Sequence, residues 1–303
     1  MRERVRRLLT PPVRAYIRYV PFGMGKRAFW NRVVEPNFAW HPHRFVASTV
    51  FGSRIAGDTS DIIQQYIYYF GVWEPHLTRW IGLRLAPGDT FIDVGANIGY
   101  FSLLASKLVG DSGVVVAIEA SPRTFGLLQA NLARNLAQNV RTVNVAASDR
   151  KGRVGLFRGP DDNIGLTTVL GDPRLAFECE VDAAPLSHLL RPEEAQTARL
   201  IKIDVEGAEW SVVAGMDSLL RAGRRDLEVI VEVTPEHLAQ QGKRPEDLVR
   251  VFRDAGFQAY RLENDYSPQS YLPPCAERRP ERIRTPIQWQ TDVVFSRQDS
   301  ELL

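Results

Sequence analysis

The chain has 303 residues, of which 44% are hydrophobic and 24% charged, and its formal net charge is +2. This composition is typical of a globular α/β protein with one large domain or two small ones, and the small net charge argues against a polyanion-binding chain. Two cysteines, Cys179 and Cys275, are too few for a disulfide framework or a cysteine-rich metal site. Because we find neither a bilayer-spanning apolar stretch nor the apolar core of a signal peptide, we expect a cytoplasmic protein.

The N-terminal segment is basic and amphipathic. Residues 1–32 contain nine Arg or Lys against one acid, Glu3. Apolar side chains at helical spacing in residues 1–20 form a stripe opposite the arginines, and we expect Pro11 and Pro12 to interrupt this helix. Such a helix either packs on the main domain or contacts an anionic membrane from one side, and both interpretations stay open. Residues 21–60 show no sustained period and are expected to form loops and short elements.

Beyond residue 60, helices and strands alternate. Asp61 is predicted to cap a first helix and Pro75 to begin a second one, which ends near Leu85. The predicted strands are 90–94, 113–120, 140–147, 199–205, 227–233, 257–262 and 291–296, and the predicted helices are 98–108, 122–135, one from about 208 and one at 245–255. Two extra strands, 152–157 and 177–186, flank a polar loop. We therefore expect a basic N-terminal extension, residues 1–60, and a Rossmann-like domain, residues 61–303, with an insertion at about 150–198.

Strands rich in Val and Ile with little alternation are typical of a parallel sheet that helices cover on both faces. Right-handed crossovers place the carboxyl ends of such strands at one edge, where ligands bind. Five acids lie at or just beyond successive strand ends: Asp93, Glu119, Asp149, Asp204 and Glu232. So regular a placement indicates a ligand site rather than solvated surface charge.

The turn after the first of these strands has the pattern D-x-G-x-N-x-G, formed by Asp93, Gly95, Asn97 and Gly99. Glycines there let a ligand approach the backbone closely. The pattern is not the G-x-G-x-x-G or G-K-[ST] of a phosphate-binding loop, and an acid would repel phosphate but attract an amine. Glu119 follows about 20 residues later, where a carboxylate accepts two ribose hydroxyls. An amine and a ribose without phosphate between them indicate S-adenosylmethionine.

Four segments resemble the FkbM family of S-adenosylmethionine-dependent methyltransferases: GDTFIDVGANIGYFSLLAS, IEASPRTFGLLQANLARN, NVAASDRKGRVGLF and IKIDVEGAEWSVVAGM. The resemblance covers about residues 50–296. It implies a seven-stranded Rossmann-like sheet with the last strand antiparallel, and methyl transfer to a hydroxyl oxygen. It also implies that the turn residues line the methionine part of the cofactor, that Glu119 binds the ribose, and that Ser148 and Asp149 lie beside the adenine. The family's TLDDL-like segment is replaced by VDAAPLSHLL, in which only Asp182 matches.

Methyl transfer to an unactivated hydroxyl requires alignment and a group that takes up the proton. The candidates lie over the fourth and fifth strands of the sheet: Lys202, Asp204, Glu206, Glu209, Glu232 and His237. Asp204 is the main catalytic candidate, and Asp204 with Glu232 is suited to a hard cation such as Mg²⁺. His237 is a base, a third ligand or a surface histidine. Lys202 and Glu209 act in catalysis or form an internal ion pair.

The predicted function is O-methylation of a sugar or glycoside hydroxyl in glycan, glycolipid or natural-product biosynthesis, with a polyketide-type hydroxyl as the alternative acceptor. We expect the extension and the insertion to shape the acceptor pocket. Aromatic and imidazole side chains suited to sugar contact, or to ordinary packing, are Trp40, His41, His43, Trp73 and Tyr266. The possibility of a homodimer stays open.

Three functions of other classes remain alternatives. A nucleotide-dependent oxidoreductase would use the same sheet, but the G-x-G-x-x-G turn is missing. A nucleic-acid methyltransferase would carry a basic face and an N-P-P-[YF]-like pocket where this chain has DVEG. A non-catalytic binding module would leave the acids at the strand ends unexplained.

Overall fold

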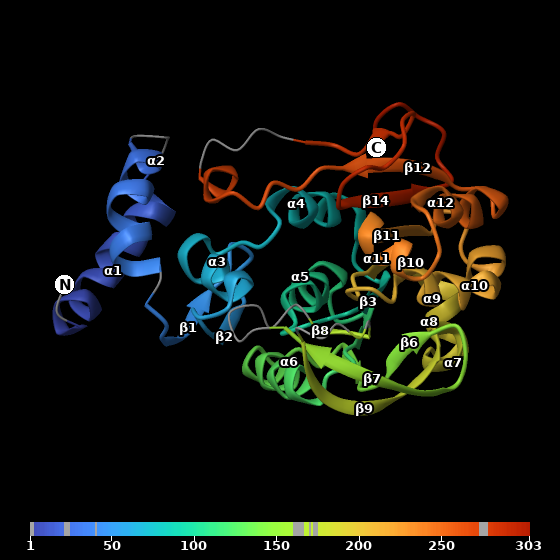
Figure 1. The fold of residues 1–303 in the computed structure, drawn as a ribbon, viewed down its shortest axis with the longest axis horizontal. Helices are drawn as coiled ribbons and strands as arrows, with labels where there is room; N and C mark the ends of the chain where they lie inside the picture. The colour runs from blue at the N-terminus through green and yellow to red at the C-terminus, as the bar shows by residue number, and fades with distance from the viewer. Residues whose placement is uncertain are drawn as a thin grey trace.

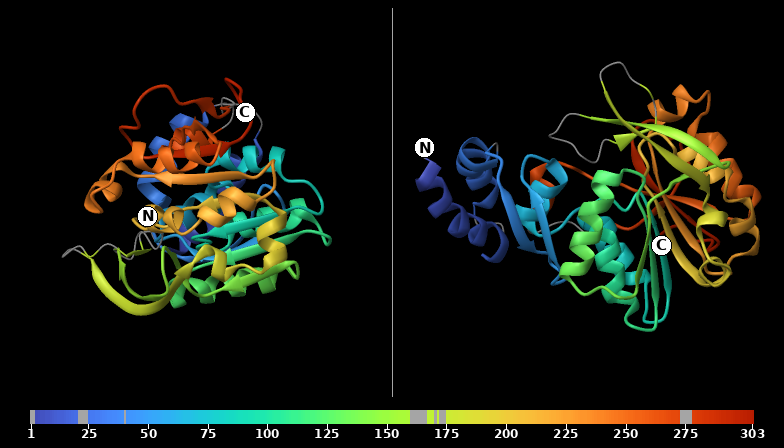
Figure 2. Two further views of the ribbon diagram at one scale, coloured as in Figure 1. Left: turned by 90° about the vertical axis from the view of Figure 1, so that its right-hand side faces the viewer. Right: turned by 90° about the horizontal axis from the view of Figure 1, so that it is seen from below.

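The computed structural model describes residues 3–20, 25–39, 41–159, 167–169, 171, 175–272 and 278–303. An α/β body carries a group of N-terminal helices at one end (Figures 1 and 2). These N-terminal elements are α1 (Glu3–Tyr19), α2 (Lys26–Phe29) and the π-helix η1 (Trp30–Ala39). None of the helices in the described part of the chain is long and apolar enough to cross a membrane.

The body is built on an eight-stranded sheet with the order β13-β12-β14-β11-β10-β3-β4-β5. Its strands are β3 (Thr90–Val94), β4 (Val114–Ile118), β5 (Val140–Val143), β10 (Ala198–Ile203), β11 (Glu228–Val233), β12 (Gln258–Leu262), β13 (Glu281–Arg282) and β14 (Thr291–Ser296). Neighbours from β5 to β11 are parallel, whereas β14 lies antiparallel between β11 and β12. The predicted seven strands and the antiparallel last strand are therefore confirmed, and the two-residue β13 is added at one edge.

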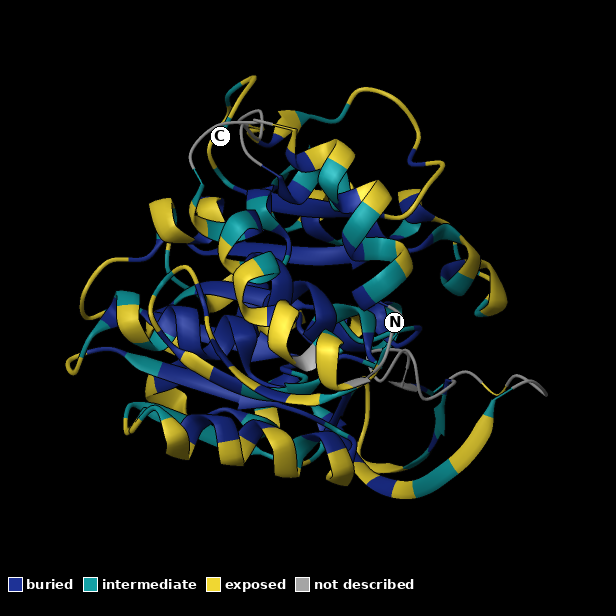
Figure 3. Cartoon of the chain, turned by 90° about the vertical axis from the view of Figure 1, so that its left-hand side faces the viewer, coloured by how far each residue is buried: buried dark blue, intermediate teal, exposed yellow. Residues whose placement is uncertain are grey.

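Helices cover both faces of this sheet, and consecutive strand residues point to opposite faces. In β3, Phe91 packs in the cluster that contains α4 (Pro75–Arg84), α5 (Tyr100–Val109) and α6 (Pro122–Arg134). Its neighbour Ile92 packs in the opposite cluster, with α9 (Glu209–Ala214), α10 (Asp217–Ala222) and α12 (Pro245–Asp254). Figure 3 shows the resulting layers, with buried strands between helices whose outer faces are exposed. Because both faces are covered, these strands are continuously apolar, as the sequence indicated. Four short helices complete the described part of the body: α7 (Leu186–Leu189), α8 (Pro192–Thr197), α11 (Pro235–Gln240) and the 3-10 helix η2 (Pro268–Tyr271).

A second, four-stranded sheet lies beside the first one and has the order β6-β9-β7-β8 (Figure 1). It contains β6 (Ala146–Ser148), β7 (Gly152–Arg158), β8 (Thr167–Thr168) and β9 (Ala176–Pro185), so the two extra strands of the insertion are confirmed. The strand predicted over 140–147 is confirmed only as far as Val143, and its second half belongs to the second sheet as β6. The chain leaves the first sheet at Asn144, whose side-chain amide donates to the carbonyls of Glu119 and Ala120 at 2.8 and 3.0 Å, and then enters the second sheet. Most of the polar loop lies outside the described residues.

One of the N-terminal predictions needs correction. Pro11 and Pro12 do not interrupt α1, which is continuous. Tertiary contacts stabilise it, because Arg14 donates to the carbonyl of Tyr68 at 2.6 Å and Ile17 is buried. The short elements expected in residues 21–60 include β1 (Arg44–Ser48) and β2 (Arg54–Asp58), which form an antiparallel pair.

The two helices predicted after residue 60 are confirmed. Helix α3 (Ile62–Phe70) begins after Asp61, whose carboxylate accepts the backbone N–H of Gln64 at 2.9 Å. This is the ordinary N-cap bond. Helix α4 begins at Pro75, as predicted.

Candidate active site

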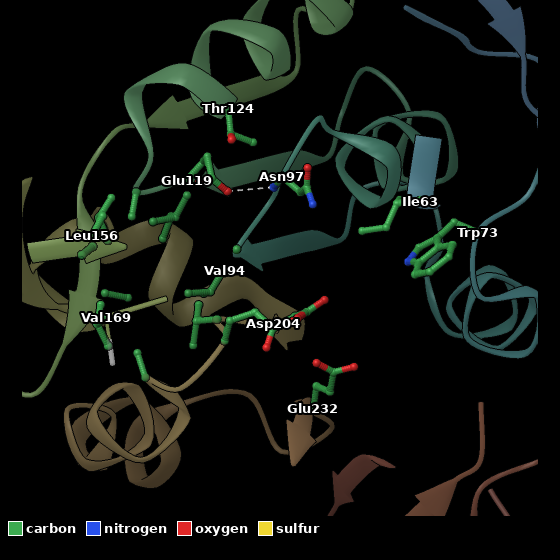
Figure 4. Close-up of a pocket in the computed structure, with 18 of the residues that line it drawn as sticks. Ile63, Trp73, Val94, Asn97, Glu119, Thr124, Leu156, Val169, Asp204 and Glu232 are labelled. Carbon is green, nitrogen blue, oxygen red and sulfur yellow. Dashed lines mark hydrogen bonds between the residues drawn. The ribbon is translucent and has the colours of Figure 1, made fainter. Parts of the chain in front are cut away.

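A cavity of about 270 Å³ opens at the carboxyl ends of β3, β4, β10 and β11. Figure 4 shows it with Leu156 and Val169 of the insertion on one side and the carboxylates of Asp204 and Glu232 on the other. Helix α3 and the chain that follows it close a further side. The cavity therefore lies at the predicted edge of the sheet, and its lining changes from apolar to acidic across it.

The turn after β3 approaches the end of β10 so closely that only glycine fits at position 95. Gly95 has φ 83°, and a Cβ there would lie 1.7 Å from the carbonyl oxygen of Asp204. The N–H of Asp204 also donates to the carbonyl of Val94 at 2.9 Å. The glycine that the sequence suggested for ligand approach thus also brings two loops of the cavity together.

Glu119 is held rigidly at the cavity wall by backbone donors. Its Oε2 accepts the N–H of Asn97 (Figure 4) and its Oε1 accepts the N–H of Ser121, both at 2.9 Å. Asn97 reaches this position with φ 49°, a left-handed conformation that asparagine tolerates. Burial raises the pKa of Glu119 to about 7 although both N–H bonds lower it. The carboxylate retains lone pairs for two further donors, which is the capacity that a ribose requires.

Two residues of the predicted turn do not line the cavity. Asp93 is 1% exposed and accepts the hydroxyl of Ser102 at 2.5 Å, while its Oδ1 has no partner among the described residues. Gly99 precedes α5 with φ 90°, and a Cβ there would lie 2.7 Å from Leu128 Cδ1. Gly99 therefore has a packing reason to be glycine.

The two residues expected beside the adenine also lie outside the lining. Ser148 Oγ donates to Asp149 Oδ1 at 3.2 Å, and Asp149 is exposed. In the region just before them, Val145, Ala146 and Ala147 line the cavity instead. Sequence reasoning missed these three because it placed them inside a strand of the main sheet.

Three carboxylates converge at the ends of β10 and β11. Asp204, Glu206 and Glu232 each offer an oxygen, and these atoms all lie within 4.8 Å of one another. Lys202 is 3% exposed and its Nζ lies 2.7 Å from Asp204 Oδ2. Burial alone would lower the pKa of Lys202, but the carboxylates of Asp204 and then Glu74 raise it, so the ammonium stays charged. The lysine pairs with Asp204 rather than with Glu209.

Burial and the nearby charge of Asp204 make two acids of this cluster, Glu206 and Glu232, weaker than free carboxylic acids. Burial first, and then the charge of Asp204, raise the pKa of Glu206 to about 7, and the same two causes raise that of Glu232 well above its usual range. His237 does not line the cavity. Its Nδ1 lies 3.8 Å from Glu206 Oε2 and 3.9 Å from Glu209 Oε1. Glu209 raises the pKa of His237, which favours an ion-pairing role.

Tyr266 connects two acids across the cavity, and one of them was missed by sequence reasoning. The Tyr266 hydroxyl lies 2.9 Å from Glu74 Oε1 and 3.1 Å from Glu232 Oε1. Gln290 also donates to Glu232 Oε1, at 2.8 Å. Glu74 precedes the proline that begins α4 and therefore looks like a helix cap, yet its side chain makes no cap hydrogen bond. No pattern in the sequence indicates that Glu74 reaches the cavity; the structure shows it.

Of the other aromatic candidates, Trp73 lines the cavity and stacks on Tyr266, with ring centroids 5.5 Å apart. His41 and His43 do not line it, and His43 packs edge-on against Tyr68. Trp40 and Cys275 lie outside the described residues. Within the part of residues 1–60 that the structure describes, no residue lines the cavity; residues 62–74 provide that side instead.

Comparison with known proteins identifies the family. Residues 93–259, more than half of the chain, match the family model described as Methyltransferase FkbM domain. The 31-O-demethyl-FK506 methyltransferase FkbM of Streptomyces tacrolimicus is 33% identical over 165 residues, which are 45% of this chain and 62% of that protein. The hexuronic acid methyltransferase AglP of Haloferax volcanii is 26% identical over 183 residues, 58% of this chain and 72% of that protein.

Among solved structures, methyltransferase FkbM from Methylobacillus flagellatus aligns with a TM-score of 0.46 and 18% identity, over 78% of this chain and 55% of that one. The match of the family model covers the turn, Glu119 and the acids of β10 and β11. The chain belongs to the FkbM family of S-adenosylmethionine-dependent methyltransferases.

Proposed function

We propose that this protein transfers a methyl group from S-adenosylmethionine to a hydroxyl oxygen of a sugar or glycoside. The proposal rests on the two ends of one cavity. At the first end the carboxylate of Glu119 is held by backbone N–H groups. The second end is lined by the acids Asp204 and Glu232 and by the ring of Trp73. The first end has the acceptor oxygens for a ribose, and the second has acceptors and a flat apolar surface for a sugar ring.

The residues present fit S-adenosylmethionine. Gly95 leaves room beside the main chain, Glu119 accepts ribose hydroxyls, and the adenine has an apolar wall of Ala146, Ala147 and Leu156 to pack on. When bound, the cofactor supplies a methyl group on a sulfonium and leaves as S-adenosylhomocysteine. The assignments of Asp93, Gly99, Ser148 and Asp149 to cofactor binding stay predictions. For Asp93 and Gly99, we propose that their contribution is to fix the shape of the turn.

Asp204 is the proposed catalytic carboxylate. Lys202 holds its Oδ2 at 2.7 Å, which fixes the group at the cavity wall and leaves Oδ1 for the acceptor hydroxyl. An acceptor oxygen hydrogen-bonded there is aligned for in-line attack, and its proton moves to a carboxylate as the new bond forms. Glu206 lines the cavity beside Asp204, whereas His237 lies behind it, with Nδ1 3.8 Å from Glu206 Oε2, so we propose that His237 acts through Glu206.

A magnesium ion is a further part of the proposal. Asp204, Glu206 and Glu232 form a hard, all-oxygen set of the kind Mg²⁺ prefers, and Glu206 extends the predicted pair to three ligands. A cation there would lower the pKa of an acceptor hydroxyl. Activity that is unchanged after chelation and dialysis would exclude a required metal and favour a base that acts without one.

The test is a methyl-donor assay that measures release of S-adenosylhomocysteine with a panel of glycosides and polyketide-type alcohols. Transfer to a glycoside hydroxyl is the expected result. Similarity to the 31-O-demethyl-FK506 methyltransferase supports the polyketide-type hydroxyl as the second acceptor class. A melting temperature that rises with NAD but not with S-adenosylhomocysteine would contradict the methyltransferase assignment and favour the oxidoreductase alternative.

We also propose that the first turns of α1 contact an anionic membrane surface. The second half of α1 docks on α3 through Ile17, whereas Val5, Leu8 and Leu9 are 44%, 76% and 43% exposed beside arginines. Apolar side chains next to basic ones bind the headgroup region of an anionic bilayer. The expected result is co-sedimentation with phosphatidylserine vesicles that Leu8→Glu abolishes, and equal binding to neutral vesicles would contradict it.

A further inference from the structure

Glu74 is placed in the cavity at a cost in backbone conformation. It lies between Gly71, which ends α3, and Pro75, which begins α4, and its φ is 43°. Few residues other than glycine adopt such a φ, and those that do cluster at functional sites. A short polar side chain such as Asp or Ser at this position would cap the helix, whereas Glu74 makes no side-chain cap bond. Its side chain turns toward the cavity instead.

The carboxylate of Glu74 is only half satisfied. The side chain is 3% exposed, and Oε1 accepts the hydroxyl of Tyr266, but Oε2 is buried without a hydrogen-bond partner among the described residues. Buried polar atoms are nearly always paired in folded proteins, so an orphaned oxygen at a cavity wall indicates a donor supplied by a ligand. The donor that a methyl acceptor brings is a hydroxyl.

The same end of the cavity carries a flat apolar surface. The rings of Trp73 and Tyr266 are stacked at an angle of 25°, and both line the cavity next to Glu74. A sugar ring has an apolar C–H face and hydroxyls at its edge. Trp73 therefore suits the face while Glu74 suits an edge hydroxyl.

The charge of the lining is one-sided. Among the described residues, the cavity is lined by five carboxylates and by no lysine, arginine or histidine: Glu74, Glu119, Asp204, Glu206 and Glu232. The nearest ammonium, Lys202, is already paired with Asp204. An anionic group on the acceptor would face these carboxylates and no cationic side chain, and one Mg²⁺ at Asp204, Glu206 and Glu232 would offset only part of their charge, which disfavours its binding.

We propose that Glu74, together with Trp73, is the specificity-determining residue for the acceptor. Its free carboxylate oxygen accepts a hydrogen bond from a second hydroxyl of an uncharged, polyhydroxylated ring, and acceptors with a carboxylate on that ring are excluded. This inference rests on the proposed function. It deepens that function by assigning the charge of the acceptor and the residue that recognises it.

The first experiment compares three matched acceptors with the full-length protein and saturating S-adenosylmethionine: a methyl glucoside, the corresponding methyl glucuronide and the 2-amino-2-deoxy glycoside. We expect kcat/KM for the neutral ring to exceed that for the uronate at least about 100-fold. A uronate used as well as the neutral ring, with or without added Mg²⁺, would overturn the inference. Preference for the amine by more than about 10-fold would overturn the assignment of an uncharged ring.

The second experiment compares Glu74→Gln with Glu236→Gln, an exposed acid of α11 that lies outside the cavity. We expect the first variant to raise the acceptor KM about 10- to 100-fold, with the affinity for S-adenosylhomocysteine unchanged, and the second to behave as wild type. A merely structural role would instead lower the melting temperature and the affinity for both substrates. Tyr266→Phe provides a second test, because it removes the hydroxyl that orients Glu74 and should raise the same KM.

The outcomes separate the two proposals. Wild-type activity on a glycoside with an unchanged acceptor KM in Glu74→Gln and Tyr266→Phe overturns this inference alone. Wild-type protein that binds S-adenosylhomocysteine but methylates no hydroxyl of any acceptor overturns the proposed function, and this inference with it.

Discussion

Replacing Gly95 by alanine tests whether the turn after β3 must touch the end of β10. The substitution has two separate costs. A φ of 83° disfavours any residue with a Cβ by about 1–2 kcal/mol. The new Cβ would also lie 1.7 Å from the carbonyl oxygen of Asp204. The Cβ is fixed to the main chain of residue 95 and the oxygen belongs to the main chain of Asp204, so no side chain can move aside. The two loops must therefore separate, which adds about 1–3 kcal/mol, the usual range for overpacking.

Gly256→Ala is the matched control, because Gly256 has φ 86° and a Cβ at this position would meet no atom within 4 Å. It should show the first cost alone. At about 2 °C per kcal/mol for a chain of this size, we expect the melting temperature to fall by about 4–10 °C in Gly95→Ala and by about 2–4 °C in the control. Calorimetry should show a loss of S-adenosylhomocysteine affinity of at least about 10-fold in Gly95→Ala only. Equal melting temperatures with retained affinity would refute the reasoning.

Three further outcomes test Glu119 and Asp204. Glu119→Gln should weaken S-adenosylhomocysteine binding about 10- to 100-fold in calorimetry, because the amide accepts fewer hydrogen bonds than the carboxylate, and unchanged affinity would remove Glu119 from the ribose. In ligand-free protein, the free energy of unfolding of Glu119→Gln should rise relative to wild type between pH 5 and 8, by up to about 3 kcal/mol in urea titrations. The sign follows because burial raises the pKa of Glu119 in the folded state from 4.5 to about 7. In this pH window the folded wild type keeps a proton that the unfolded chain releases. The folded wild type therefore loses stability as the pH rises. A difference that does not vary with pH would contradict this. Asp204→Asn should leave cofactor binding intact and lower turnover at least about 100-fold, and normal turnover would exclude Asp204 from the mechanism.

Local patterns predicted most of the body because local physics decides them. A strand such as Thr90–Val94 is buried on both faces, so its central residues are apolar up to the acid near its end. The starts of α3 after Asp61 and of α4 at Pro75 are likewise decided by neighbouring residues. The N-terminal helix was mispredicted at Pro11 because its docking on α3, a long-range contact, outweighs the loss of local hydrogen bonds.

The sequence by itself determined the order of strands and helices, the glycine turn at Gly95 and the position of Glu119, since each depends on residues that lie close together in the chain. Only the tertiary structure decided that Glu74 meets Tyr266, which is 192 residues away, across one cavity. It also decided that Ala146 rather than Ser148 lines that cavity. The physical reason is that a strand end fixes where its own residues point, whereas the partner of a buried carboxylate depends on how distant loops pack over the sheet.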